Sequence, residues 1–266
     1  MRGRRVLRHG TTIHGAQLLG PGYRHRPISY YGVSTGIGLV MAQRGQGHPL
    51  EIGIVGMGAG SLAAYGEAGD RIRFYEIDPS VVGFAGRDGY FTFLEDSQAS
   101  IEIIPGDGRL SLQRELDRGQ RNRFDLLVID AFSSDSIPFH LMTREAYALF
   151  LEHLKPSGLI AVHASSRHFN LEPILYRVGE SPRSRSHERE QHAFRNEGCS
   201  PRQMDLPEPR SGKNRSLEAA RRKAHARIGL DTSKLFFGEL EPSGYMQEPL
   251  WTNDFNSLLS VLKKLK

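Results

Sequence analysis

The chain has 266 residues, of which 38% are hydrophobic and 24% charged, as is usual for a protein that folds around a core. No stretch approaches the roughly 18 uncharged apolar residues of a transmembrane helix, and the basic start MRGRRVLRHG lacks the apolar segment of a secretory signal. The single cysteine, Cys199, excludes an intrachain disulfide and a cysteine-rich zinc site, and it favours a reducing, cytoplasmic location.

The net charge of +5 comes from one segment of the chain. Residues 179–227 hold 12 Lys and Arg against 7 Asp and Glu, a difference of +5, so the remainder is formally neutral. A basic segment of this kind is not a binding face spread over a whole fold. We therefore expect no nucleic-acid partner.

Residues 1–45 are expected to form a small N-terminal β-hairpin region. The stretch RVLRHGTTIHGAQLL predicts two strands joined by a polar turn, and a Gly and Pro cluster follows it. The next stretch, ISYYGVSTGIGLVMA, predicts a helix that begins near Ser34 or Thr35.

Residues 46–178 alternate short apolar stretches with helical patterns. Strands are expected, in chain order, in EIGIVG, IRFYEID, IEIIPGD, FDLLVID and LIAVHAS. Helices are expected in SLAAYGEAG, in a polar stretch after the second strand, in RLSLQRELDRG, and in TREAYALFLEHLKPSG, which Pro156 and Gly158 close. This alternation predicts an α/β fold with a parallel sheet and helices on both faces.

The remaining chain departs from this rhythm. Residues 179–227 have almost no β-branched or aromatic residues and are interpreted as an irregular basic insertion; a degraded or frameshifted stretch is the alternative. Residues 228–266 are expected to form a C-terminal tail that ends in an amphipathic helix.

A glycine-rich turn follows the first strand of the α/β region. GIVGMGAGSLAAYG places Gly56, Gly58 and Gly60 between strand and helix, where glycine permits a tight turn and the close approach of a ligand. The second strand ends in YEID, with Glu76 twenty positions after Gly56. An acid at this point can accept hydrogen bonds from both ribose hydroxyls of a nucleoside.

The third strand ends in GDGR, which puts Asp107 and Gly108 at the same carboxyl edge of the sheet. Ligands of open parallel sheets bind at this edge, and an acid there could meet an adenine amino group. The spacing GxGxG, rather than GxGxxG, favours a nucleoside of the adenosylmethionine type over a dinucleotide. The alternative is structural: Gly58 allows helix–strand packing and Glu76 caps a helix.

Two more acids follow the fourth strand in FDLLVIDAFSSDSIPFHLMTREAY. Asp130 and Asp135 lie at the mouth of an apolar strand, where a carboxylate can hold an amine cation and help remove its proton as the amine attacks. Two acids would suit a dicationic diamine. The structural alternative is that Asp130 ends the strand and Asp135 caps the next helix.

The histidines form no metal-binding pattern. His14, His140, His163 and His168 show neither HxxxH nor HExxH spacing, so no metal is expected. His163, in the fifth strand, is interpreted as a core or edge residue. His14 could line a site, but it is interpreted as a residue of the hairpin.

Taken together, six motifs resemble those of the spermidine synthase family of aminopropyltransferases, and more closely the bacterial spermidine-synthase-like proteins, some of which are fused to transporter-like membrane segments. The motifs are HGTTIHGAQ, SYYG, VGMGAG, YEIDP, GDGR and DAFSSDSIPFHLMTREAY. They cover roughly residues 5–178, and the final WTNDFNSLL extends the resemblance.

The resemblance implies a Rossmann-like, methyltransferase-type parallel sheet after a small N-terminal β-domain. It implies transfer of an aminopropyl group from decarboxylated S-adenosylmethionine to a diamine such as putrescine. It further implies Gln17 near the donor, Glu76 on the ribose and Asp107 near the adenine. Asp130 would be the acid beside the attacking amine, and either Tyr30 or Tyr31 the substrate-side tyrosine.

The chain departs from the family pattern in two places. Ala59 stands where the family's glycine turn usually has an aspartate that holds the donor's amino group, and the acidic turn is lengthened to DAFSSDSIP. Asp135 can serve as the second acid of this turn only if the turn folds back. A methyltransferase that uses S-adenosylmethionine and a non-catalytic nucleoside-binding relative therefore stay open, as does a homo-oligomer.

Overall fold

The computed structural model describes residues 3–10, 12–42, 48–87, 89–132, 137–163, 171 and 174–175. The expected insertion over 179–227 and the tail over 228–266 lie outside these residues. Within the described part of the chain, no helix is long and apolar enough to cross a membrane.

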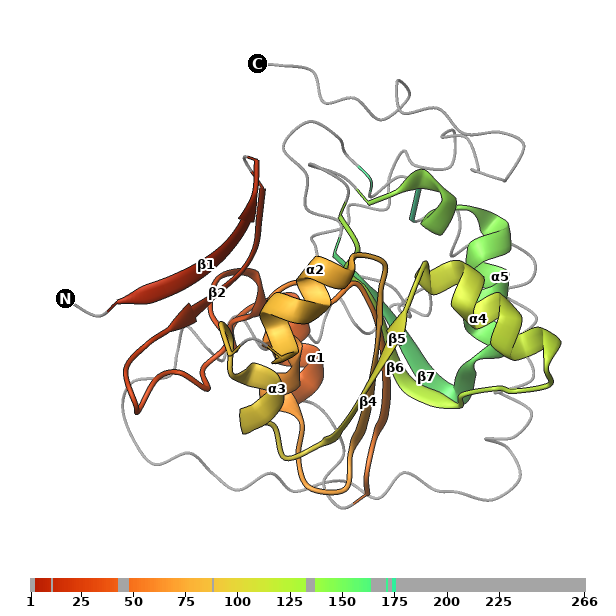
Figure 1. Ribbon diagram of the computed structural model, residues 1–266. Coiled ribbons are helices and arrows are strands. Elements are labelled where there is room, and N and C mark those ends of the chain that lie inside the picture. Colours follow the sequence, from red (N-terminus) through yellow and green to blue (C-terminus); the bar gives the residue numbers. More distant parts are fainter. Residues whose placement is uncertain are drawn as a thin grey trace, which may run out of the picture.

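The N-terminal hairpin pairs β1 (Arg4–His9) antiparallel with β2 (Thr12–Leu18) and extends away from the sheet (Figure 1), as the sequence predicts. A short 3-10 helix, η1 (Ser29–Tyr31), and α1 (Gly36–Ala42) connect the hairpin to the first strand of the sheet. Arg5 ties the hairpin to the body of the protein, because its guanidinium donates to the carbonyl oxygens of Gly89 and Tyr90.

The central sheet has five described strands that are all parallel: β3 (Glu51–Val55), β4 (Arg71–Glu76), β5 (Ser100–Pro105), β6 (Phe124–Ile129) and β7 (Leu154–Val162). Their spatial order is β5-β4-β3-β6-β7. The chain moves outward from β3 to β5 and then crosses to the other side of β3. Such a reversal creates a crevice at the carboxyl ends of the two central strands, β3 and β6, where ligands of this fold class bind.

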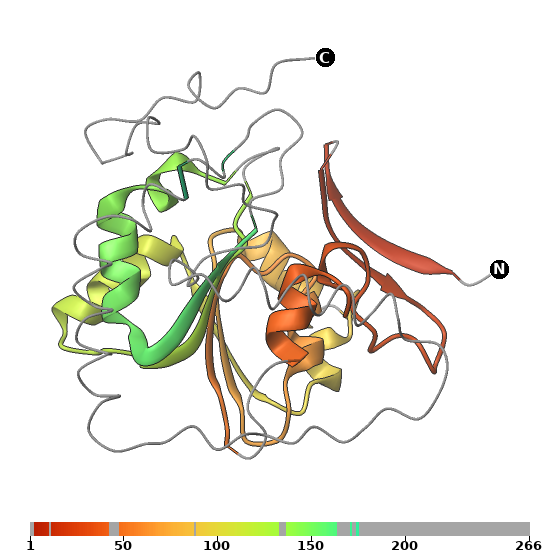
Figure 2. The same ribbon diagram turned by 180° about the vertical axis from the view of Figure 1, so that it is seen from behind.

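Helices cover both faces of the sheet, which confirms the predicted Rossmann-like α/β architecture. Figures 1 and 2 show α1, α2 (Pro79–Val82) and α3 (Phe93–Asp96) on one side, with α4 (Gly108–Asp117) and α5 (Arg144–Glu152) on the other. Two further short helices are the π-helix η3 (Gly83–Arg87) and the 3-10 helix η4 (Phe139–Leu141).

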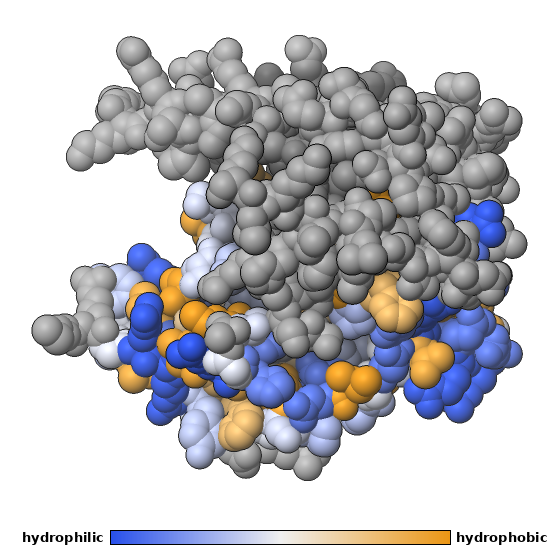
Figure 3. Space-filling view, turned by 90° about the horizontal axis from the view of Figure 1, so that it is seen from above, coloured by the Kyte–Doolittle hydropathy of each residue, from blue (hydrophilic) through white to orange (hydrophobic). Residues whose placement is uncertain are grey.

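The strand sequences explain the two layers. Successive side chains of a strand point to opposite faces of the sheet. In β6, Leu126 and Val128 belong to the hydrophobic cluster that includes residues of α1 and α3. Leu127 and Ile129 belong to the cluster on the other face, which includes residues of α4 and α5. Because both faces are buried, the strand reads as a continuous apolar run. Hydrophilic and hydrophobic side chains are intermixed on the described part of the face in Figure 3.

Two predicted helices differ from the structure. SLAAYGEAG forms only the five-residue 3-10 helix η2 (Ser61–Tyr65), which ends at Gly66. The predicted helix in TREAYALFLEHLKPSG stops at Glu152, and β7 takes up the chain from Leu154. Pro156 and Gly158 therefore lie in a strand, beside the register shift between β6 and β7, where the irregular pairing tolerates a residue without an N–H.

Candidate functional site

The glycine turn after β3 depends on left-handed backbone. Gly56, Gly58 and Gly60 have φ angles of +94°, +52° and +76°, which residues with a Cβ rarely adopt. A Cβ on Gly56 would also lie 2.5 Å from the carbonyl oxygen of Asp130. Gly56 therefore lets the turn after β3 lie directly beside the end of β6. The glycine turn and Asp130, which the sequence assigns to one site, are thus neighbours in the structure.

The N-terminal hairpin packs on this turn. The N–H of Ala59 donates to the carbonyl oxygen of His14 at 3.3 Å, and a Cβ on Gly58 would clash with the same oxygen. A Cβ on Gly15 would clash with the Cβ of Ala59. The close approach at Gly58 is thus to the hairpin backbone, and not the helix–strand packing that the sequence suggested as the structural alternative.

Glu76 ends β4 and turns its carboxylate toward the glycine turn. Its Oε2 accepts from the N–H of Met57 at 2.8 Å and its Oε1 from the N–H of Asp78 at 2.9 Å, with the residue 7% exposed. The cap of α2 is Asp78, which accepts from the N–H of Ser80. The alternative that Glu76 caps this helix is therefore wrong, and two backbone donors fix its carboxylate beside the turn.

Asp107 lies at the N-terminus of α4, after β5. Its Oδ1 accepts from the N–H of Leu110 at 2.9 Å, which makes it the cap of the helix, and its Oδ2 contacts Nε2 of His140 at 3.0 Å. Gly108 packs under the sheet, since a Cβ on it would lie 2.6 Å from Cγ1 of Val55. Both residues have structural contacts that the sequence did not predict.

Gln17 is buried within the protein, with 1% of its surface exposed. Its Nε2 donates to the carbonyl oxygen of Arg24 at 2.8 Å and to Oγ1 of Thr92 at 2.9 Å, and its Oε1 accepts from the N–H of Thr92 at 3.2 Å. These bonds join the hairpin to the segment before α3. The amide of Gln17 is thus held by protein groups.

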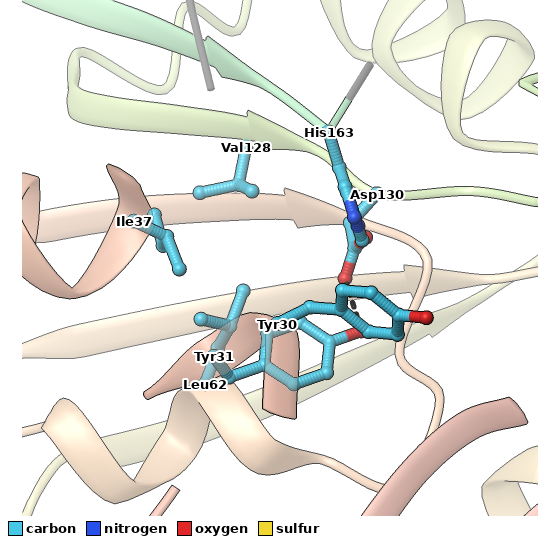
Figure 4. Close-up of a pocket in the computed structure, with 7 residues that line it drawn as sticks. All are labelled: Tyr30, Tyr31, Ile37, Leu62, Val128, Asp130 and His163. Carbon is cyan, nitrogen blue, oxygen red and sulfur yellow. Dashed lines mark hydrogen bonds and ion pairs between the residues drawn. The ribbon is translucent and has the colours of Figure 1, made fainter. Parts of the chain in front are cut away.

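Asp130 directly follows β6, and its side chain lines a small pocket (Figure 4). Its Oδ2 accepts a hydrogen bond from the hydroxyl of Tyr31 at 2.8 Å, and its Oδ1 contacts Nδ1 of His163 at 2.7 Å. The pocket encloses an empty volume of about 180 Å³, part of it open to solvent. Its lining residues are Tyr30, Tyr31, Ile37, Leu62, Val128, Asp130 and His163.

The two tyrosines that the sequence left as alternatives have different positions. Tyr31 reaches Asp130, and burial together with that carboxylate raises the pKa of the Tyr31 phenol well above its usual range, so the hydroxyl stays a donor. Tyr30 is 53% exposed, and its ring centroid lies 5.3 Å from that of His163. Tyr31 therefore contacts the acid, while Tyr30 forms an open wall of the pocket.

His163 is a site residue that sequence reasoning missed. It follows β7, and its backbone N–H donates to the carbonyl oxygen of Ile129 at 3.0 Å, which sets its ring beside Asp130. The interpretation as a core or edge residue considered only its own strand. The available signal was that His163 and Asp130 lie in the carboxyl-terminal halves of two predicted parallel strands, whose carboxyl ends share one edge of the sheet.

His14 also lies within electrostatic reach of the site. The pKa of the His14 imidazole is lowered, mainly by burial and to a smaller extent by the neighbouring His9. The carboxylates of Glu76 and Asp130 act to raise this pKa. The hairpin thus brings a polar side chain toward the two acids that end β4 and β6.

The structure groups the predicted residues only in part. Asp130, Tyr30 and Tyr31 line one pocket, and Glu76 joins the adjacent glycine turn, whereas Gln17, Glu76 and Asp107 do not line the pocket around Asp130. Asp135 lies outside the described residues. Over the described ranges, no group of three or more His, Cys, Asp or Glu side chains could hold a metal ion.

The described fold and site define a class: an open parallel α/β sheet with acids at the carboxyl ends of its central strands. No protein-family model matches the chain. The chain is 32% identical to the polyamine aminopropyltransferase of Vibrio vulnificus (strain CMCP6) over 136 residues, which make up 48% of this chain and 43% of that protein.

A second relative is the probable polyamine aminopropyl transferase of Bifidobacterium longum (strain NCC 2705). It is 31% identical over 115 residues, 41% of this chain and 23% of that protein. The resemblance to spermidine synthase-like proteins that the motifs indicate is therefore confirmed over the matched stretch. The chain spans less than half the length of these curated relatives.

Solved structures are similar at a lower level. The crystal structure of a spermidine synthase in complex with the transition-state analogue AdoDATO has 18% identity and a TM-score of 0.41, over 60% of this chain and 58% of that chain.

Proposed function

We propose that this chain transfers an aminopropyl group from decarboxylated S-adenosylmethionine to an amine such as putrescine, in polyamine biosynthesis. The observation that carries the proposal is the carboxylate of Asp130, which contacts Tyr31 and His163 and lines a pocket directly after β6. The similarity to two polyamine aminopropyltransferases supports the same reaction.

The reaction needs a group like Asp130. An alkylamine is protonated near neutral pH, yet only the neutral amine can attack. A carboxylate binds the ammonium and helps to remove its proton as the carbon–nitrogen bond forms. As the carbon–nitrogen bond forms, the carbon–sulfur bond breaks, and its electron pair neutralises the sulfonium. Because this leaving group is already activated, the protein mainly has to align the amine, carbon and sulfur and exclude water.

The donor nucleoside would lie along the glycine turn. Each oxygen of Glu76 accepts one backbone N–H, and a carboxylate has about four acceptor positions in total, so capacity remains for two ribose hydroxyls. We propose that Asp107 lies near the adenine and Gln17 near the donor's aminopropyl end. Asp135, which belongs to the same lengthened turn as Asp130, is proposed to bind the distal amine of a diamine.

One feature favours a second candidate, a methyltransferase that uses S-adenosylmethionine. Ala59 is 1% exposed and packs against Gly15, so no acidic side chain at this point can hold the donor's amino group. A methyl donor keeps its carboxylate and does not need such an acid. A nucleoside-binding protein without catalysis is the third candidate.

The test is an assay of the purified chain with putrescine and either decarboxylated or intact S-adenosylmethionine. We expect spermidine and methylthioadenosine to form only with the decarboxylated donor. Methylation of an amine with the intact donor would select the second candidate. A thermal melt that rises with methylthioadenosine, without turnover of either donor, would select the third.

The variant Asp130→Asn tests the role of this carboxylate, because it keeps the size of the side chain and removes its charge. We expect its transfer rate to fall roughly 100-fold or more, the usual range for a general base. The shift in melting temperature with methylthioadenosine should persist, because Asp130 faces the amine. Full activity of the variant would reduce Asp130 to a structural role.

A further inference from the structure

We propose that His163 is the positioning residue of Asp130: its Nδ1–H holds one carboxylate oxygen so that the acid meets the attacking amine in a fixed orientation. This inference rests on the proposed function and assigns to it a residue that the sequence did not suggest.

The first support is the way in which both residues are fixed. Asp130 follows β6 and its N–H donates to the carbonyl oxygen of Val55, while His163 follows β7 and its N–H donates to the carbonyl oxygen of Ile129. These parallel strands are neighbours in the sheet. The side chains are 7% and 13% exposed, so the 2.7 Å contact between them is shielded from water.

The second support is how the carboxylate is shared. Tyr31 donates to Oδ2 and His163 faces Oδ1, so among the described residues each oxygen has a side-chain partner of its own. Two such contacts from different elements fix the plane of the carboxylate, and Figure 4 shows the acid between the two rings. A single contact would leave the group free to rotate about its Cβ–Cγ bond.

The third support is the packing of the imidazole itself. Its ring centroid lies 4.8 Å from that of Phe132 in an edge-on arrangement and 5.3 Å from that of Tyr30. Aromatic neighbours restrict the rotation of the ring. The neighbouring rings therefore fix the orientation of the His163 imidazole. A residue can orient another side chain only if its own position is fixed.

Two substitutions separate positioning from packing. His163→Phe keeps an aromatic ring but removes the Nδ1 donor. His163→Asn loses the ring but keeps a donor, because its Nδ2 is as many bonds from the Cβ as Nδ1 of histidine. We expect the rate constant kcat with putrescine and decarboxylated S-adenosylmethionine to fall about 10- to 100-fold in His163→Phe, the usual cost of losing an orienting partner.

His163→Asn should recover at least part of this loss in kcat. Both variants should retain the increase in melting temperature with methylthioadenosine, because the nucleoside contacts are unchanged. The matched control is His25→Phe, which makes the same substitution at an exposed histidine outside the pocket and should leave kcat unchanged.

The outcomes separate the two proposals. If the wild-type chain is active and His163→Phe keeps its kcat, or His163→Asn is the weaker variant, the ring serves packing and the positioning role is wrong. If the wild-type chain transfers no aminopropyl group, the proposed function fails and this inference fails with it.

Discussion

At the scale of single residues, the site depends on which hydrogen-bond partners surround each acid. Asp130, Glu76 and Asp107 all end strands of one sheet, yet each has a different environment. Glu76 accepts from two backbone N–H groups, Asp107 caps a helix, and Asp130 meets two side chains. The third arrangement lines the pocket that also includes Tyr30.

Tyr31→Phe tests this arrangement from the side opposite His163. The change removes the hydroxyl that donates to Oδ2 of Asp130 and keeps the ring. We expect kcat to fall roughly 10-fold, by the free energy of one hydrogen bond to a charged group, about 1.5 kcal/mol. The Michaelis constant for the donor should stay near the wild-type value.

The pH dependence of the transfer rate provides a control for the same residue. The raised pKa of Tyr31 means that its phenol stays protonated through the neutral and mildly alkaline range. Tyr31→Phe should therefore lower the rate by the same factor from pH ~6 to pH ~9. A loss that appears only on the alkaline side would contradict a role as a hydrogen-bond donor.

At the scale of elements, the glycine turn is where backbone conformation and packing coincide. Gly56 has a φ of +94°, and a Cβ on it would lie 2.5 Å from the carbonyl oxygen of Asp130. The turn after β3 can lie against the end of β6 only without a side chain at this position.

Gly56→Ala is expected to lower the free energy of unfolding by about 2 kcal/mol or more, because backbone strain and a clash with fixed backbone add together. The matched control is Gly119→Ala, since Gly119 has a φ of +77° and nothing within 4 Å of a Cβ. The free energy of unfolding of Gly119→Ala should fall only by the cost of placing a residue with a Cβ in left-handed backbone, about 1–2 kcal/mol. Urea unfolding measures both, and equal losses would show that the clash is relieved.

At the scale of the whole molecule, a buried polar group on the α4 and α5 side links stability to pH. His153 is fully buried; its Nε2 lies 3.0 Å from the carbonyl oxygen of Leu112 and its Nδ1 lies 3.0 Å from Nδ2 of Asn122. These partners fit a neutral ring that donates from Nε2 and accepts at Nδ1. Burial lowers the pKa of His153 below its ordinary value of 6.5.

A lowered pKa in the folded state sets the direction of the effect. The unfolded chain takes up a proton near pH 6.5 and the folded chain only at lower pH, so stability is complete above pH 6.5 and is lost as the pH falls below it. One such group contributes a slope of at most about 1.4 kcal/mol per pH unit.

His153→Gln should flatten this dependence, because glutamine can still donate to Leu112 and does not titrate. We expect the variant to be less stable than the wild type near neutral pH and the difference to narrow by pH ~5. Urea unfolding at several pH values measures this difference. A constant difference across the range would mean that His153 titrates alike in both states.

Comparison of the sequence predictions with the structure gives a consistent pattern. The five strands and the hairpin were predicted from periodicity, and Asp130 from its place after an apolar strand. The end of the helix before β7 was predicted wrongly because Pro156 and Gly158 look like helix terminators, whereas sheet pairing already takes over at Leu154. Gly58 was predicted to belong to a ligand-binding turn, with helix–strand packing as the alternative; its contact with the hairpin could not be deduced from neighbouring residues.

The sequence by itself determined what depends on near neighbours: the positions of the strands and most helices, the glycine turn, and the acids at the strand ends. Only the tertiary structure decided which side chains meet. Tyr31 lies 99 positions from Asp130 and His163 lies 33 positions away, yet both contact the same carboxylate. For His163 the physical reason is that strand order and register, which depend on packing across the whole sheet, set the ends of β6 and β7 side by side. Tyr31 reaches the same carboxylate from η1, which lies outside the sheet.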